Sequence, residues 1–171
     1  MFSLPGKINH VNKAKLTIHL TTGHMLDFKE WVESSQECVV KITLNDVVLY
    51  HNTVDQPVQL EHEFLDQDPG SYKLKIEVEK IVDGFDVDGI WASPMLHITG
   101  TWIENLNLRL ALEEYGRCHY PEHPDIVVPS EYMGSVGETS LEFTTPIYKW
   151  LMQCDQYEDT TYYSPMLLNT A

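Results

Sequence analysis

Three aspartates within a short run are the carboxylates of this sequence that are best spaced to bind a metal ion. Asp83, Asp86 and Asp88 lie in the run Asp-Gly-Phe-Asp-Val-Asp-Gly. Calcium binds several carboxylate and carbonyl oxygens at about 2.3–2.6 Å. The spacing departs by one residue from the loop of an EF-hand, and no glutamate follows where that loop needs one. The run is therefore a weak calcium site or a solvated acidic turn, and we favour the turn.

A second cluster of metal-ligand residue types lies in the C-terminal third. Cys118, His119, Glu122 and His123 form the pattern Cys-His-x-x-Glu-His, and zinc binds side chains of all three types. Two neighbouring residues cannot easily reach the same ion, and no second cluster completes a set of four ligands. Zinc binding therefore competes with a simpler interpretation, a polar loop rich in aromatic residues and prolines, which we favour.

Motifs of the common enzyme classes do not occur in the sequence. It contains no Gly-x-Ser-x-Gly motif, no His-Glu-x-x-His motif and no glycine-rich phosphate loop. His62 and His97 fall on strand patterns, where a histidine more often packs in the core or against a neighbouring strand than catalyses a reaction. We therefore expect a protein that is not an enzyme and that needs no cofactor, the weak calcium site apart.

The charge of the chain excludes two classes of partner. The sequence has 26 acidic and 11 basic residues, and its formal net charge is −15. Nucleic acids and anionic membranes both select clustered lysines and arginines, so we expect neither as a partner. Residues 111–171 hold only Arg117 and Lys149 against ten acidic residues. This acidic third either serves solubility or forms a docking surface for a basic partner.

The cysteines point to a reducing compartment. Cys38, Cys118 and Cys154 cannot all pair within one chain, and the first residues lack the apolar stretch of a secretion signal. We therefore expect reduced thiols and synthesis in a cytoplasm. Cys38 lies in an apolar strand pattern and is predicted to be buried.

Alternation of apolar and polar residues dominates the sequence and indicates strands. Strands are predicted over residues 14–20, 38–44, 47–51, 58–64, 72–82, 95–103, 106–112 and 140–143. About eight strands separated by turn residues predict an all-β fold, an antiparallel jelly-roll-like β-sandwich. One short C-terminal helix is expected after Thr144-Thr145-Pro146, since threonine caps helices and proline suits the first helical position.

Local features refine this outline. Asn45-Asp46 is expected to form a two-residue turn, because both residue types tolerate positive φ. Gly100, inside a strand pattern, suggests a bulge or a close backbone approach. Residues 106–112 place four leucines at a spacing of two, which favours a strand. A helix is the alternative prediction for these residues, because leucine, arginine and alanine also favour helices.

The alternation also predicts the core and one set of charge pairs. Core positions are predicted at Leu16, Ile18, Val40, Ile42, Leu60, Phe64, Leu74, Ile76, Leu96, Ile98 and Trp102. Outward positions carry Glu61 and Glu63 in one strand and Lys73 and Lys75 in the next. A hairpin between these two strands would pair opposite charges.

Both ends of the sequence lack the sandwich pattern. We divide the chain into an N-terminal arm (1–13), a β-sandwich domain (14–154) and a C-terminal arm (155–171). Candidate interface residues in the arms are Phe2, Leu4, Tyr157, Tyr162, Tyr163, Met166, Leu167 and Leu168. Apolar side chains are stabilised by burial, so the arms pack on their own chain or bind a neighbouring subunit, and we favour the neighbour. A frayed C-terminus remains the simplest alternative.

Aromatic residues crowd the C-terminal third, among them Tyr115, Tyr120, Tyr132, Tyr148 and Trp150. Tyrosine and tryptophan rings stack on sugars and anchor protein interfaces. Most tryptophans of a sandwich of this size lie in the core. A carbohydrate platform, a protein interface and the core itself therefore stay open as roles for these rings.

One resemblance covers roughly residues 38–103. The stretches VVKITLNDVVLYHN and EHEFLDQDPGSYKLKIEVEKI look like the sandwich of calcium-dependent carbohydrate-binding modules. In those modules a strand with an Asn turn leads to a strand bounded by a Pro-Gly turn. Beyond the loop of Asp83, Asp86 and Asp88, the ligand-binding signatures of the modules do not occur here. The resemblance therefore carries no binding site over to this chain.

A broader resemblance covers residues 38–152. HEFLDQDPGSYKLKIEVEKI, ITGTWIENLNL and FTTPIYKWLMQ together are similar to small β-sandwich virion proteins of large contractile-tailed phages. This resemblance implies a non-enzymatic structural protein of the head, neck or tail, made in the host cytoplasm and localised in the virion. Its partners would be other virion subunits in many copies. The alternative is a carbohydrate-binding module or host-adhesion domain that binds a surface glycan.

Overall fold

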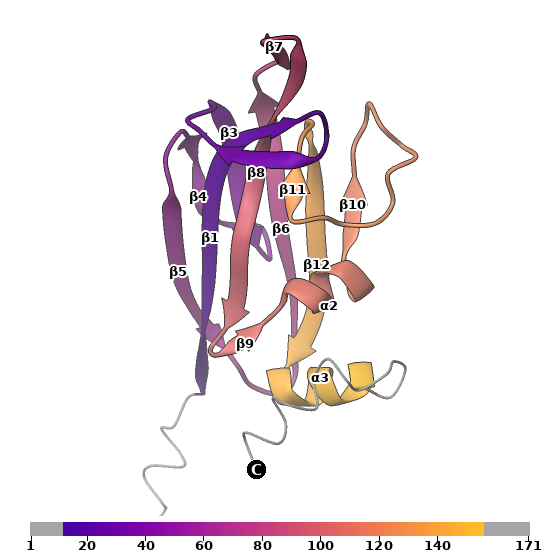
Figure 1. Ribbon diagram of the computed structural model, residues 1–171. Coiled ribbons are helices and arrows are strands. Elements are labelled where there is room, and N and C mark those ends of the chain that lie inside the picture. The colour runs from indigo at the N-terminus through magenta and orange to yellow at the C-terminus, as the bar shows by residue number, and fades with distance from the viewer. Residues whose placement is uncertain (1–11, 156–171) are drawn as a thin grey trace, which may run out of the picture.

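The computed structural model describes residues 12–155, which form two antiparallel sheets packed face to face (Figure 1). The first sheet contains β1 (Lys13–Leu26), β2 (Glu30–Glu33), β5 (Val58–Leu65), β7 (Phe85–Val87), β8 (Ile90–Ile103), β9 (Leu106–Asn107) and β11 (Tyr132–Met133). The second contains β3 (Cys38–Leu44), β4 (Val47–Val54), β6 (Gly70–Ile81), β10 (Arg117–His119) and β12 (Gly137–Thr145). The predicted fold class, an all-β antiparallel sandwich with a short C-terminal helix, is confirmed.

Two long strands form the centre of the first sheet, because β1 pairs with β8 along most of its length. On its other side, β1 pairs first with β5 and then with β2. The second sheet has the order β10-β12-β6-β3-β4. The strands of both sheets run between two ends of the sandwich, and β1 leads from the end near α3 (Ile147–Asp155) to the end near β7 (Figure 1).

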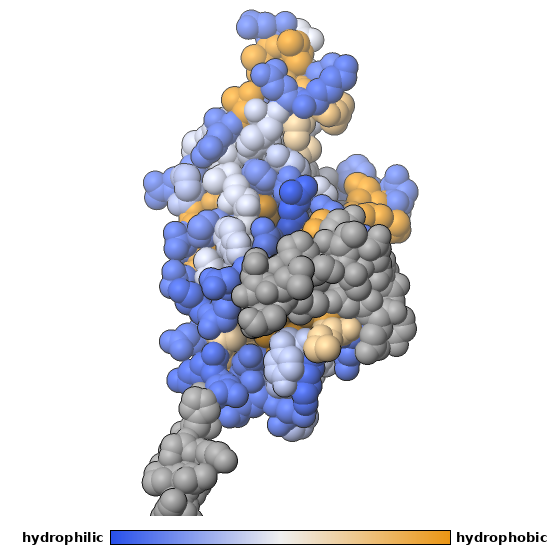
Figure 2. Space-filling model, turned by 60° about the horizontal axis from the view of Figure 1, so that its bottom comes forward, coloured by the Kyte–Doolittle hydropathy of each residue, from blue (hydrophilic) through white to orange (hydrophobic). Residues whose placement is uncertain are grey.

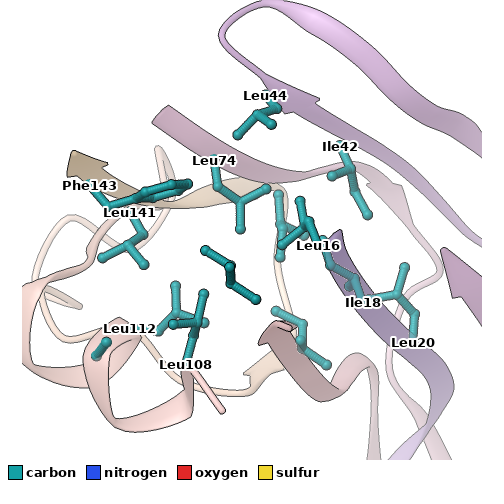
Figure 3. Packing of buried hydrophobic residues seen from close by; sticks show 14 of the residues in the cluster. Leu16, Ile18, Leu20, Ile42, Leu44, Leu74, Leu108, Leu112, Leu141 and Phe143 are labelled. Atoms are coloured by element: carbon teal, nitrogen blue, oxygen red, sulfur yellow. The ribbon is translucent and has the colours of Figure 1, made fainter. Parts of the chain in front are cut away.

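The core lies between the inner faces of the two sheets (Figure 3). Leu16 and Ile18 of β1 point toward Ile42 and Leu74 of the second sheet, and all four are completely buried. Among the predicted core positions, those that prove buried are Leu16, Ile18, Val40, Ile42, Phe64, Leu74, Ile76, Leu96 and Ile98. Leu60 is half-buried against the same cluster. Cys38 is also buried, as predicted.

The prediction for Trp102 is wrong, and a bulge in β8 explains why. Leu20 pairs with Ile98 but the preceding residue, His19, pairs with Gly100, so Thr99 has no partner across the ladder. One extra residue reverses the side to which every later residue points. Trp102 therefore lies on the outer face, where its ring centroid is 4.9 Å from that of His19.

The predicted hairpin between the strands of residues 58–64 and 72–82 is also wrong. β5 pairs with β1, whereas β6 lies in the other sheet between β12 and β3. The expected charge pairs are therefore made with other strands. Glu61 contacts Lys15, with 3.8 Å between nitrogen and oxygen, and Lys75 contacts Glu138 at 3.6 Å.

Most of the strand predicted over residues 106–112 is a helix. Only β9 is extended, and α2 spans Arg109–Tyr115. Leu108, Ala111 and Leu112 are buried at the three- and four-residue spacing of a helix face. The side chain of Asn107 accepts a hydrogen bond from the backbone N–H of Arg109 at 2.9 Å, which forms an Asx turn immediately before the helix.

The predicted turn and the place of the C-terminal helix agree with the structure, but the predicted helix cap does not, because α3 begins after Pro146 and the hydroxyl of Thr145 donates a 2.6 Å hydrogen bond to the carbonyl oxygen of Gln67. Asn45 and Asp46 have φ values of 50° and 67°, as a two-residue turn between β3 and β4 requires. α3 buries Trp150 and Leu151, and its N-terminus is fixed by Asp66, which accepts a 2.8 Å hydrogen bond from the backbone N–H of Ile147. In residues 12–155, no helix has the length and apolar character needed to cross a membrane.

Candidate functional site: an apolar groove at one end of the sandwich

A groove of about 790 Å³ opens at the end of the sandwich where β1 finishes and β8 begins. One wall is the β7–β8 hairpin with the β1–β2 turn, and the other is the long connection from β10 to β11 (Figure 1). Pro94 and Met95 of β8 line it between the two walls. Its volume falls within the roughly 300–1,000 Å³ that ligand sites usually occupy.

The first wall is built around Trp91. Asp88 and Gly89 form the tip of the hairpin with φ values of 51° and 84°, which returns the chain along β8. The Trp91 ring lies against Gly84, where an added Cβ would overlap it, and 49% of the residue stays exposed. Phe28, 71% exposed, extends this wall from the β1–β2 turn.

The second wall is a loop that is anchored at its base and apolar at its tip. Tyr120 is buried in the core, and its carbonyl oxygen accepts a 2.9 Å hydrogen bond from the backbone N–H of His123. The carbonyl oxygen of His123 in turn accepts one at 3.0 Å from the N–H of Ile126. Beyond these turns, Val127 and Val128 are 70% and 63% exposed.

Exposed apolar side chains concentrate at this groove. The described residues include thirteen large apolar side chains that are exposed, and six of them line the groove: Phe28, Val82, Trp91, Ile126, Val128 and Val136. Two more, Ile90 and Val127, are sequence neighbours of these. Figure 2 shows apolar surface at the hairpin end and on the projecting loop. Apolar surface gathered in this way marks interaction sites.

The charge of the groove is acidic. Asp83 and Glu122 line it, and no lysine or arginine does so in the described part of the chain. Asp86, Asp88 and Asp125 follow close by in sequence on the hairpin and the loop. A partner that carries apolar side chains together with positive charge therefore complements the groove.

A cluster of three rings supports the groove from the outer face of the first sheet. Tyr132, which lines the groove, stacks on His97 with 4.2 Å between ring centroids. Trp31 contacts His97 edge-on and Tyr132 at a tilt, with centroid distances of 5.2 and 5.1 Å. Burial lowers the pKa of His97 below its ordinary value, against the opposing effects of Glu131 and Glu33. Because these rings cover one another, they hold β11 in place rather than offering an open platform to a sugar.

The predicted metal ligands do not come together. Asp86 lies within β7 and Asp88 at the tip of the hairpin, while Asp83 lies in the loop before them. Cys118 and His119 belong to β10, whereas Glu122 and His123 lie in the following loop. In the described residues, no group of three or more His, Cys, Asp or Glu side chains is placed to hold a metal ion.

Comparisons with protein-family models, with curated proteins and with solved structures find no match to this chain. The groove is therefore the feature of the described residues that bears on function. The candidate interface residues of the two arms, Phe2, Leu4, Tyr157, Tyr162, Tyr163, Met166, Leu167 and Leu168, lie outside the described residues. The aromatic residues of the C-terminal third differ in burial: Tyr120 and Trp150 are buried, whereas Tyr148 on α3 is 55% exposed.

The groove residues themselves are not predicted by the sequence pattern. Phe28, Trp91 and Val128 lie in turns or at strand ends, where alternation gives no signal. The one available signal was the run Ile-Val-Val at residues 126–128, flanked by Pro124 and Pro129. Three apolar residues in a proline-bounded loop have no strand partner to bury them, which suggests an exposed apolar surface.

Proposed function

We propose that this chain is a non-enzymatic structural subunit that acts by binding other protein subunits through the groove. The observation that carries the proposal is the concentration of exposed apolar side chains there: Phe28, Val82, Trp91, Ile126, Val128 and Val136. Solvent does not stabilise such a surface, and a partner that covers it removes apolar area from water.

The energetics indicate what size of partner the groove needs. Burying one Val, Ile or Phe side chain fully stabilises by about 1.5–3 kcal/mol, whereas a complex with a micromolar Kd needs about 8 kcal/mol after the costs of association. One contact is therefore too little. A polypeptide segment that covers several of the exposed side chains at once is the occupant that this surface favours.

The broader setting follows from the resemblance to small virion proteins of tailed phages. We propose that the subunit belongs to the head, neck or tail of such a particle and is present there in many copies. The sandwich fold agrees with that setting, and the virion role itself rests on the resemblance.

Sedimentation velocity of the full chain over a range of concentrations tests the proposal. Val128→Asp places a charge in the groove at a residue that is 63% exposed. Val47→Asp is the matched control, since Val47 is 58% exposed at the start of β4, outside the groove. We expect self-association that Val128→Asp weakens and Val47→Asp leaves unchanged, with both variants folded. A chain that stays monomeric at all concentrations, or equal effects of the two variants, would contradict the proposal.

Glycan binding is the second candidate function, and one observation favours it. The Trp91 ring lies against Gly84 and is half-exposed at the rim of the groove, and tryptophan rings stack on sugars in this way. Titration with oligosaccharides, followed by tryptophan fluorescence, tests this candidate. Binding that Trp91→Ala removes would favour it over protein assembly.

A further inference from the structure

One segment of this chain has the composition that the groove favours. The first acidic residue of the sequence is Asp27, and residues 1–26 carry Lys7, Lys13 and Lys15. A basic stretch of this length is unusual in a chain with a net charge of −15. Within it, residues 1–11 combine Lys7 with the apolar residues Phe2, Leu4, Pro5, Ile8 and Val11.

We propose that residues 1–11 of one copy bind in the groove of a second copy, so that copies associate head to tail. This inference rests on the proposed function and names the partner. The groove offers apolar side chains, Asp83 and Glu122, and no lysine or arginine among its described lining residues. An apolar segment with one lysine and no carboxylate matches it in both respects.

The length of β1 bears on whether the segment that occupies the groove comes from the same copy or from a second copy. Met95, which lines the groove, pairs with Gly23 of β1. From Lys13 to Gly23 there are ten steps (23 − 13 = 10), or about 33 Å at the usual rise of a strand. Eleven residues span at most about 36–40 Å when fully extended. The chain's own segment, fully extended, would reach the groove with only about one or two residues left to contact it, so a second copy is the occupant that can place the whole segment there.

The positions of the N-terminal segment and of the groove limit how copies can associate. Residue 12 leaves the sandwich at the end near α3, and the groove opens at the end near β7 (Figure 1). If the segment of each copy binds the groove of the next copy, the contact is heterologous and its repetition gives closed rings or open filaments, whereas two copies that exchange their segments form a closed dimer.

The C-terminal arm fits the groove less well. Residues 156–171 carry Glu158 and Asp159 and no lysine or arginine. Like charges across an interface oppose association, so Asp83 and Glu122 disfavour this arm although it is also apolar. We therefore expect a peptide from the N-terminal arm to bind the groove and a peptide from the C-terminal arm not to bind it, which an experiment can distinguish.

The test uses a labelled peptide of residues 1–12 and the full chain at concentrations where it is monomeric, with binding followed by fluorescence anisotropy. We expect saturable binding that Val128→Asp in the chain weakens at least tenfold and Val47→Asp changes less than twofold. A Lys7→Glu peptide should bind at least fivefold more weakly at low salt. The difference should shrink as salt rises, because screening weakens the contribution of charge. Unlabelled peptide should also dissociate the self-associated full chain in sedimentation velocity.

Three outcomes overturn the inference: no binding of peptide 1–12, equal binding to the chain with Val128→Asp, or binding of peptide 156–171 in its place. Sedimentation velocity of the full chain distinguishes a failure of this inference from a failure of the proposed function. If the full chain self-associates, Val128→Asp weakens that association and peptide 1–12 does not bind, then the groove is an assembly site with a different occupant. The absence of both self-association and peptide binding removes the two proposals together.

Discussion

Replacing Phe64 by alanine tests the packing that joins the two sheets. Phe64, on β5 of the first sheet, is 6% exposed. Its ring centroid lies 5.0 Å from that of Tyr72 and 5.8 Å from that of Phe143, both in the second sheet. Phe143 lies 6.1 Å from Trp150 of α3. One ring of the first sheet therefore contacts a cluster that joins the second sheet and the C-terminal helix.

The expected loss of stability is large. Truncation of a buried phenylalanine to alanine costs about 3–5 kcal/mol, which includes the cavity that remains. The edge-on contacts of Phe64 with Tyr72 and Phe143 place it toward the upper part of that range, since aromatic pairs contribute about 0.5–1.5 kcal/mol beyond area burial. For a domain of this size, such a loss lowers Tm by roughly 6–20 °C.

Urea denaturation followed by circular dichroism measures the change in the free energy of unfolding, and calorimetry measures Tm. Phe28→Ala, measured at concentrations where the chain is monomeric, is the matched control, because it is the same substitution at a side chain that is 71% exposed, where we expect a change within about 0.5 kcal/mol. A loss below about 1 kcal/mol for Phe64→Ala, or equal losses for the two variants, would show that the sheets are not packed through this cluster.

Three further predictions concern titration, thiol reactivity and calcium. Burial lowers the pKa of His97, so its contribution to stability is present above the unfolded pKa of about 6.5 and is lost as pH falls below it. His97→Phe should therefore reduce the drop in Tm between about pH 7.5 and 5.5, and an unchanged drop would contradict this. Burial raises the pKa of Cys38 to about 12, so iodoacetamide at pH 8 should leave Cys38 unlabelled until the chain unfolds, as peptide mass spectrometry would show. Millimolar calcium should leave Tm equal to that in chelator, because the carboxylates of the β7–β8 hairpin are not gathered; a rise in Tm would restore a calcium site.

The parts of the fold that could be predicted are those that a period of two determines. Leu16 and Ile18 of β1, like Ile42 of β3, follow the alternation and are completely buried. Within a regular strand that is covered on one face, burial follows the side of the strand that a residue occupies, and the sequence shows that alternation directly. Strand partners are different: β5 and β6 are consecutive, yet they lie in opposite sheets, and alternation within each strand is the same for either arrangement.

The bulge at Thr99 shows a second limit. Gly100 indicated an irregularity, but the glycine did not show which residue would lose its partner. If Thr99 had stayed in register, Trp102 would have pointed inward. Because it is bulged, Thr101 and Ile103 take the buried positions and Trp102 packs on the outer face against His19. A single residue thus decides the environment of the whole end of β8, and only the pairing with β1 reveals it.

The groove could not be predicted for both of these reasons, strand pairing and local irregularity, because its walls come from segments that no periodic pattern describes. Trp91 is placed by the two-residue turn at Asp88 and Gly89, and Val128 by a loop whose base is fixed by buried Tyr120. Only the run at residues 126–128 gave a signal in the sequence, and its meeting with the hairpin depends on β1 and β8 being long enough to bring the two together. The same length of β1 places Asn12, where the described part of the chain begins, at the end of the sandwich opposite the groove (Figure 1). The long central strand therefore contributes to the groove at one end and begins beside Asn12 at the other, which is the separation on which the proposed association between copies depends.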